Sequence, residues 1–396
     1  MPYLLASTSF ELRYCGRRKN FPISFYLLVL SIMTEKSKNT LVYFGTQTAG
    51  ESDGIYRCLL NSDNGELTGV ALAAKIGNPG FLAIHPSELY LYSTGDKLEW
   101  DERDAGSVNA FSRELKNGDL KLINRQSSVG SGPCHLSVDD EGKSLFVANY
   151  GGGSAAAFPV MSDGSLGEAK SFIQHKGRSG VHPTRQNQSH AHSIFLDLSN
   201  RFALVCDLGL DQVLVYKINP AMASLDPHDP PFARVAGGAG PRHLAFHQTR
   251  KWVYVLNEIN STVTVFSFDE EIGSLKEEQS ISALPKDCNV ESTCAEILLS
   301  PDGHFLYASN RGHDSLAIYS VNEENGRLTP VGHQSVLGKT PRNFAFDPSG
   351  KFVVVANQDT SDVYSFLYNE NSGNLETTGY SIEIPNPICV RMIAVS

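Results

Sequence analysis

The sequence predicts an all-β fold, a seven-bladed β-propeller with four antiparallel strands in each blade. Three observations predict it. One strand–turn–strand pattern recurs along the chain at spacings of 46 to 58 residues. Within each repeat, short runs alternate apolar and polar residues and are rich in β-branched and aromatic residues, a period typical of strands. Each chain end carries part of one further repeat, and four strands at a period of about 50 residues is a blade pattern.

Each repeat opens with a proline or a small residue that starts a short apolar run. The openers are Pro79, Pro133, Ala191, Pro241, Cys294, Pro341 and Pro387. A turn follows, as at residues 300–303, where Ser-Pro-Asp-Gly is typical of a type I turn. A β-rich second run comes next, as at 352–355, and ends in Asn or Asp in most repeats. A third alternating run, as at 262–266, and a more polar fourth strand complete the repeat.

The two chain ends together complete one more blade. Residues 387–395 supply a first strand with no partners after it. The N-terminal part, from Thr40, begins instead at a second strand, 41–44, and continues through 54–57 and 67–76. One C-terminal and three N-terminal strands make a blade, which with six internal repeats gives seven. Closing the ring in this way leaves no long open sheet edge.

Composition and charge exclude several classes of function. The formal net charge is -10, which disfavours nonspecific binding to nucleic acid or to anionic membranes, so we expect neither as a partner. The seven cysteines are an odd number without a C-x-x-C pair, which indicates neither a disulfide framework nor a zinc site and fits a reducing compartment. No P-loop or Gly-x-Gly-x-x-Gly unit is present. We therefore expect no metal and no cofactor.

Residues 1–38 differ from the rest and are interpreted as an N-terminal extension, with residues 39–396 forming the propeller domain. Basic residues from Arg13 to Lys19 precede an apolar stretch, 21–33, that is too short for a typical membrane-spanning helix. This order resembles a signal peptide, although no small-x-small cleavage site follows. Equally, Met33 could begin the protein, with residues 1–32 an over-extended gene start. The expected location is cytoplasmic, with export as the alternative.

Residues that break the symmetry of the repeat indicate where a site lies. First-strand openings and second-strand ends meet near one mouth of a propeller channel. At these positions the chain places residues that differ from their equivalents in other blades: His192, Arg242, Glu258, Glu296 and Arg311. Arginines near one axis repel each other unless an anion or a carboxylate lies between them. Glu258 and Glu296 could provide that carboxylate, and a bound substrate could provide the anion.

The motifs around these positions resemble the lactonase family of seven-bladed propellers, over nearly all of residues 40–396. This family includes the 6-phosphogluconolactonases of the cycloisomerase-2 type and the fungal carboxy-cis,cis-muconate cyclases. The motifs are 183–186 running into 190–192, 207–209, 240–243, 257–258, 309–312, and 341–343 with 356–358. In the fungal cyclases a His, two Arg and a Glu are proposed to do the chemistry. The resemblance therefore implies catalytic roles for His192, Arg242, Glu258 and Arg311.

Lactone hydrolysis matches these residue types. The carbonyl oxygen gains negative charge as water attacks, and the water must lose a proton to a base. We expect Glu258 or His192 to activate water, and Arg242 and Arg311 to hold the oxyanion or an acidic group. The substrate we expect is 6-phospho-D-glucono-1,5-lactone, an intermediate of the oxidative pentose phosphate route. Arg185 and His190 are candidates to bind its phosphate. The full set of candidate substrate-binding residues is His135, Arg185, Gln186, His190, Asp207, His243, Glu296, Arg342, Asn343 and Gln358.

Two other functions remain open on the sequence alone. A muconate-type cycloisomerase would use the same channel residues without water, on a substrate that carries carboxylates. A noncatalytic propeller would serve as a binding platform, which the fold permits. The expected partner is a small-molecule lactone, phosphorylated or carboxylated, and the expected assembly is a monomer or a weak homodimer.

Overall fold

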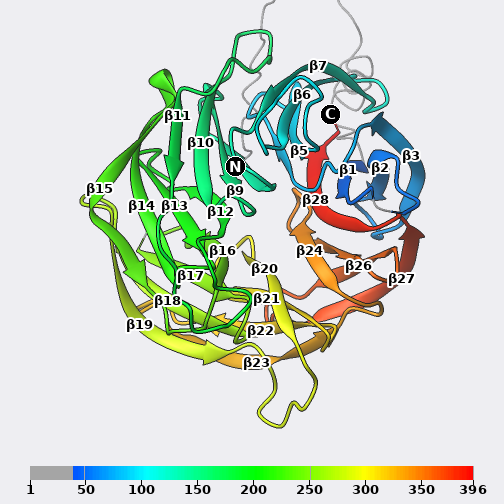
Figure 1. Ribbon diagram of the computed structural model, residues 1–396. Helices are drawn as coiled ribbons and strands as arrows, with labels where there is room; N and C mark the ends of the chain where they lie inside the picture. Colours follow the sequence, from blue (N-terminus) through cyan, green and yellow to red (C-terminus); the bar gives the residue numbers. More distant parts are fainter. Residues whose placement is uncertain (1–38, 49, 250, 396) are drawn as a thin grey trace, which may run out of the picture. The chain divides into compact units, whose positions relative to one another are not determined.

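The structure, a computed structural model, describes residues 39–48, 50–249 and 251–395. These residues form seven four-stranded antiparallel sheets, which follow one another as the blades of a ring (Figure 1). The predicted all-β fold and the number of blades are confirmed. The predicted N-terminal extension, residues 1–38, lies outside the described residues.

The strands take equivalent places in each blade. The first strands, next to the ring centre, are β28 (Pro387–Ala394), β4 (Leu82–Ile84), β8 (Pro133–Val138), β12 (Ala191–Leu196), β16 (Pro241–Phe246), β20 (Thr293–Leu299) and β24 (Pro341–Phe346). The second strands are β1 (Asn39–Thr46), β5 (Tyr90–Gly95), β9 (Ser144–Asn149), β13 (Phe202–Asp207), β17 (Trp252–Asn257), β21 (Phe305–Arg311) and β25 (Phe352–Asn357). The third strands are β2 (Gly54–Asn61), β6 (Ser107–Arg113), β10 (Ser154–Pro159), β14 (Gln212–Asn219), β18 (Thr262–Asp269), β22 (Ser315–Val321) and β26 (Asp362–Tyr368). The fourth strands are β3 (Leu67–Lys75), β7 (Leu120–Ser127), β11 (Ser171–Gln174), β15 (Ser224–Arg234), β19 (Ser274–Ser282), β23 (Leu328–Ser335) and β27 (Leu375–Glu383).

One blade is closed by strands from both ends of the propeller. Its strand order is β28-β1-β2-β3, so the last strand of the chain pairs with the first (Figure 1). The pairing is antiparallel, with Tyr43 opposite Arg391 and Phe44 opposite Val390. The composite blade predicted from the leftover half-repeats is therefore confirmed, and the ring closes by backbone hydrogen bonds between the chain ends.

Burial explains why the second strands read as continuous apolar runs. Every residue of β9, β13 and β25 is buried, because both faces of these strands pack against neighbouring blades. The outer strand β23 has mostly half-buried or exposed residues, and its sequence is correspondingly polar. Between blades the apolar side chains form continuous clusters; in one of them Tyr307 and Leu316 pack with Val353 and Val355 of the next blade.

A repeated hydrogen bond ties neighbouring blades together. In four blades a buried tyrosine of the second strand donates its hydroxyl to the carbonyl of a glycine in the next blade, in the turn between the third and fourth strands. The pairs are Tyr43 with Gly118 at 2.6 Å, Tyr92 with Gly164 at 3.1 Å, Tyr254 with Gly326 at 3.0 Å and Tyr307 with Gly373 at 2.5 Å. All four glycines have positive φ, between 68° and 81°, a backbone conformation that glycine adopts without steric cost.

Replacing Gly326 by Ala tests this contact between blades. Gly326 has φ of 68°, and a Cβ there would lie 2.3 Å from Cδ2 of Trp252, so both the backbone and the packing resist the change. We expect a loss of about 1–3 kcal/mol in the free energy of unfolding, seen as a lower midpoint in urea denaturation. Gly332→Ala in the same blade is the control, because nothing lies within 4 Å of its Cβ position. Equal losses in the two variants would contradict this account.

Besides strands, the described residues contain one short 3₁₀ helix, η1 (Pro220–Met222). No helix in this part of the chain has the length and hydropathy needed to cross a bilayer.

Candidate active site

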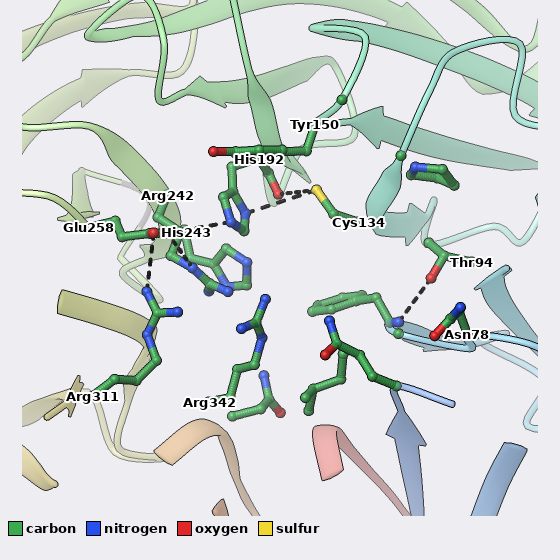
Figure 2. Close-up of a pocket in the computed structure, with 18 of the residues that line it drawn as sticks. Asn78, Thr94, Cys134, Tyr150, His192, Arg242, His243, Glu258, Arg311 and Arg342 are labelled. Carbon is green, nitrogen blue, oxygen red and sulfur yellow. Dashed lines mark hydrogen bonds and ion pairs between the residues drawn. The ribbon is translucent and has the colours of Figure 1, made fainter. Parts of the chain in front are cut away.

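A cavity of about 510 Å³ opens where the first strands converge. All four residues predicted to be catalytic line it: His192, Arg242, Glu258 and Arg311 (Figure 2). Four of the predicted substrate-binding residues line it as well: Arg185, His243, Arg342 and Asn343. The structure thus brings together side chains from several blades that lie far apart in sequence.

β-Bulges at the start of the first strands aim several of these side chains into the cavity. In four blades the pairing of the first and second strands skips one residue: Cys134, His192, Arg242 and Arg342. All four skipped residues line the cavity. A bulge leaves its extra residue unpaired and re-aims the side chain, so one local irregularity, repeated from blade to blade, supplies much of the site. Glu258 and Arg311 come instead from the ends of second strands, and Arg185 from the loop before β12.

Glu258 is the centre of a cationic cluster. Its Oε1 lies 2.5 Å from Nη2 of Arg185 and 3.2 Å from Nη2 of Arg311. Its Oε2 accepts a hydrogen bond of 3.1 Å from Nε of Arg242 and lies 3.5 Å from Nε2 of His192. Burial by itself would raise the pKa of Glu258, but the positive charges of Arg311, Arg242 and Arg185 hold it far below its usual range. Glu258 is therefore an ionised carboxylate and a weak base.

Arg342 has a neutral side-chain partner instead of a carboxylate. Its Nη1 donates a 3.1 Å hydrogen bond to the amide oxygen of Gln358, whose Nε2 in turn donates to Gln47 at 2.9 Å. Among the described residues, no carboxylate lies within ion-pair distance of Arg342. Burial, with Arg242 and Arg311 nearby, lowers the pKa of Arg342 to about 9. This guanidinium is still charged at neutral pH, and an anion in the cavity would relieve the repulsion.

The two histidines that line the cavity are neutral at neutral pH. Burial, followed by the positive charge of Arg242, holds the pKa of both His192 and His243 well below the usual value. A neutral imidazole can accept a proton, whereas imidazolium cannot. The described residues contain no group of three His, Cys, Asp or Glu side chains placed to hold a metal ion.

Two predicted substrate-binding residues have their side chains in loop contacts outside the cavity lining. Gln186 donates from Nε2 to the carbonyl of Leu208 at 2.8 Å and to Oδ1 of Asp211 at 2.6 Å. Asp207 lies 2.7 Å from Nδ1 of His175 and accepts from the backbone amide of His190 at 2.8 Å. These contacts hold the loop that carries Arg185.

Four further predicted residues lie behind the lining. His190 stacks on Tyr150 with ring centroids 4.5 Å apart. His135 packs against Phe81, with ring centroids 4.1 Å apart, and is fully buried. Gln358 reaches the cavity through Arg342, and Glu296 does so through His243 and Asn343.

Several lining residues were absent from the predicted set. They are Gln47, Asn78, Gly80, Phe81, Thr94, Gly132, Pro133, Cys134, Tyr150, Gly151 and Ile388. A signal existed for three of them. Cys134 holds the bulge position occupied by His192 in the next blade, and Tyr150 and Gln47 each follow a second strand, as Glu258 does. Asn78 and Thr94 hold neither of these positions in the repeat.

Comparison with known proteins identifies the family. The family described as "Lactonase, 7-bladed beta-propeller" matches residues 41–392. A 6-phosphogluconolactonase of Bacillus subtilis (strain 168) is 35% identical over 351 residues, covering 89% of this chain and 97% of that protein. A second 6-phosphogluconolactonase, of Formosa agariphila, is 36% identical and covers 75% of this chain and 83% of its own. The structure of a periplasmic gluconolactonase of Pseudomonas aeruginosa is similar with a TM-score of 0.84 at 33% identity, covering 90% of this chain and 100% of that one. The resemblance read from the channel motifs is confirmed: the chain belongs to the lactonase family of seven-bladed β-propellers.

Proposed function

We propose that the protein hydrolyses a sugar lactone, and that the substrate is 6-phospho-D-glucono-1,5-lactone, which yields 6-phosphogluconate. Two relatives named 6-phosphogluconolactonase support the reaction. The cavity, at about 510 Å³, is of a size usual for small-molecule sites. The observation that carries the proposal is the charge of the cavity, where one carboxylate faces several arginines.

Surplus positive charge suits an anionic substrate. Arg185, Arg242 and Arg311 share the single carboxylate Glu258, and Arg342 has no carboxylate partner among the described residues. Arginine binds phosphate or carboxylate oxygens in a planar, bidentate fashion. Arg342 is therefore the best candidate to hold the phosphate. Arg185 is already engaged by Glu258, and the His190 ring is engaged by Tyr150.

The reaction needs two kinds of group, one to stabilise the carbonyl oxygen and one to activate water. Arg242 and Arg311 face the carbonyl oxygen and stabilise the negative charge that develops on it. Glu258 keeps these guanidinium groups in place. Because its pKa is so low, we expect Glu258 to act as their counter-ion rather than as the group that takes a proton from water. Water activation then falls to a neutral histidine of the cavity, either His192 or His243.

The direct test is a substrate panel with the purified protein. Freshly generated 6-phosphogluconolactone should disappear far faster than by its spontaneous hydrolysis. Formation of a muconolactone from a carboxymuconate, without lactone hydrolysis, would instead assign a cycloisomerase. No turnover of any compound in the panel would favour a noncatalytic platform and overturn the proposal.

Replacing Arg342 by Gln tests the phosphate site. Losing a charge-assisted hydrogen-bonding partner costs about 1.5–3 kcal/mol, so we expect KM for the phosphorylated lactone to rise about 10- to 100-fold. KM for unphosphorylated glucono-1,5-lactone should change little, because that substrate has no phosphate. The control is Arg327→Gln, at an exposed arginine in the turn before β23. An equal change for both lactones would place the phosphate elsewhere.

A further inference from the structure

A buried hydrogen-bonded chain runs behind the cavity and ends on His243. At its centre is Glu296 of β20, which is 3% exposed. Its Oε1 accepts from the backbone amide of Ile297 at 3.0 Å and lies 2.9 Å from Nδ1 of His243. Its Oε2 accepts from the amide nitrogen of Asn343. The carboxylate thus connects two residues that line the cavity, on β16 and β24.

The directions of the hydrogen bonds in this network follow from two backbone amides, those of Val390 and Ile297. The amide of Val390 can only donate, and it donates to Oδ1 of Asn343 at 2.8 Å. The side-chain nitrogen of Asn343 must therefore face Glu296 as a donor. Ile297 offers Glu296 a second fixed donor. Burial raises the pKa of Glu296, and the nearby charges of Arg391 and Arg242 oppose that rise. As an ionised carboxylate, Glu296 accepts from both donors. Its remaining partner, Nδ1 of His243, then carries a hydrogen, and Nε2 of His243 carries a lone pair.

His243 is oriented in a way that His192 is not. Within the described part of the chain, Nε2 of His243 makes no hydrogen bond, although the residue lines the cavity. The imidazole of His192 has only long contacts, 3.5 Å from Nε2 to Glu258 and 4.0 Å from Nδ1 to Sγ of Cys134. A base held by a carboxylate on its far nitrogen is the arrangement that activates nucleophiles in many hydrolases.

We propose that His243 is the catalytic base of the proposed lactone hydrolysis, and that Glu296 and Asn343 are positioning residues that keep its Nε2 free of hydrogen. This inference rests on the proposed function. Nε2 of His243 takes a proton from water as the water oxygen bonds to the lactone carbonyl carbon. The tetrahedral oxyanion then collapses and the bond between that carbon and the ring oxygen breaks. The ring oxygen takes the proton back from His243, leaving a hydroxy acid and a neutral imidazole.

The charges around His243 set its pH dependence. Facing it are Arg242 from its own strand, His135 from β8, His192 from β12, Glu258 after β17, Glu296 from β20, Arg342 from β24 and Arg391 from β28. Burial first, then Arg242 and Arg391, keeps the pKa of His243 well below its usual value. A base must be unprotonated, so kcat/KM should be level near neutral pH and fall in acid, as His243 gains a proton.

Glu296→Gln is the first test of the positioning role. An amide has one acceptor atom, whereas three donors face Glu296, so one end of the new amide must meet a donor. If its nitrogen turns to His243, the hydrogen of the imidazole moves to Nε2 and the base is lost. We expect kcat for glucono-1,5-lactone to fall about 10²- to 10⁴-fold. The control is His304→Gln, which breaks an exposed His–Glu pair on the outside of the propeller and should leave the rate unchanged.

Adding Asn343→Asp to Glu296→Gln should restore part of the rate. The new carboxylate accepts from Val390 and from the new amide nitrogen, so the new amide oxygen again faces Ile297 and His243. The net charge equals that of the wild type. We expect at least a tenfold recovery over Glu296→Gln, whereas Asn343→Asp alone should be impaired because two carboxylates then face each other. If Glu296 and Asn343 only stabilised the fold, the double variant would not recover both the rate and the fall of kcat/KM in acid.

The outcomes separate this inference from the proposed function. If the wild-type protein turns over no lactone, both the proposed function and the role of His243 are wrong. If the wild type is active, three results would each overturn the role of His243: full activity of Glu296→Gln, a double variant no better than the single one, or full activity of His243→Gln alongside inactive His192→Gln. Thermal unfolding of each variant shows whether a loss of activity results from a loss of folded protein.

Discussion

Replacing Glu258 by Gln is expected to lower lactone turnover about 10²- to 10⁴-fold. Glu258 is 3% exposed and is the shared counter-ion of Arg185, Arg242 and Arg311. Removing one partner of a buried ion pair leaves an uncompensated charge and costs about 3–5 kcal/mol. Repulsion would then move the guanidinium groups away from the carbonyl oxygen that they are proposed to stabilise.

The measurement is kcat of purified protein on freshly made 6-phosphogluconolactone, corrected for spontaneous hydrolysis, with thermal unfolding recorded in parallel. Glu323→Gln, at a largely exposed glutamate, is the matched control. Glu258→Asp keeps the charge and should retain more activity than the amide. A folded Glu258→Gln protein with a near-normal rate would remove Glu258 from the site.

Arg311→Met is expected to lower kcat about 10²- to 10³-fold with a smaller change in KM. Arg311 is anchored by hydrogen bonds from Nη2 to the carbonyl of Cys294 at 2.7 Å, and it contacts Glu258 at 3.2 Å. Its Nε is buried without a hydrogen-bond partner among the described residues. We expect the guanidinium charge of Arg311 to stabilise the negative charge that develops on the carbonyl oxygen. Methionine keeps much of the side-chain volume but supplies neither charge nor donor.

The division between kcat and KM distinguishes Arg311 from Arg342. A group that acts on the transition state lowers kcat, whereas a group that holds a substituent throughout the reaction raises KM. Arg311→Lys should recover part of the charge effect, and Arg327→Met serves as the surface control. If Arg311→Met changed only KM, Arg311 would belong with Arg342 to the anion site.

The strands, the number of blades and the composite blade could be read from the sequence because their signals are local. Alternation at a period of two residues marks a strand wherever it lies, and turn residues mark its end. The four residues predicted to be catalytic break equivalent columns of the repeat, and the resemblance to the fungal cyclases implied their roles. In the structure all four line one cavity, and their roles remain proposals.

Contacts between neighbouring side chains were not readable in the same way. Arg185 and Gln186 are adjacent in sequence, yet Arg185 reaches Glu258 whereas Gln186 is fully buried and donates to Asp211. His135 and His243 hold equivalent places in two blades, but His135 packs on Phe81 while His243 pairs with a carboxylate. Glu258, Phe81 and Glu296 each come from another blade, and the place of a residue in the repeat does not indicate such a partner.

The sequence by itself determined the seven blades, the closure of the ring and which residues depart from the repeat. Only the tertiary structure decided that Glu258 pairs with arginines, that Arg342 bonds to the amide of Gln358, and that Glu296 contacts His243. The physical reason is the range of the interactions. Strand formation depends on neighbours in the chain, whereas the charge and hydrogen-bond state of a buried group depend on atoms brought close by folding.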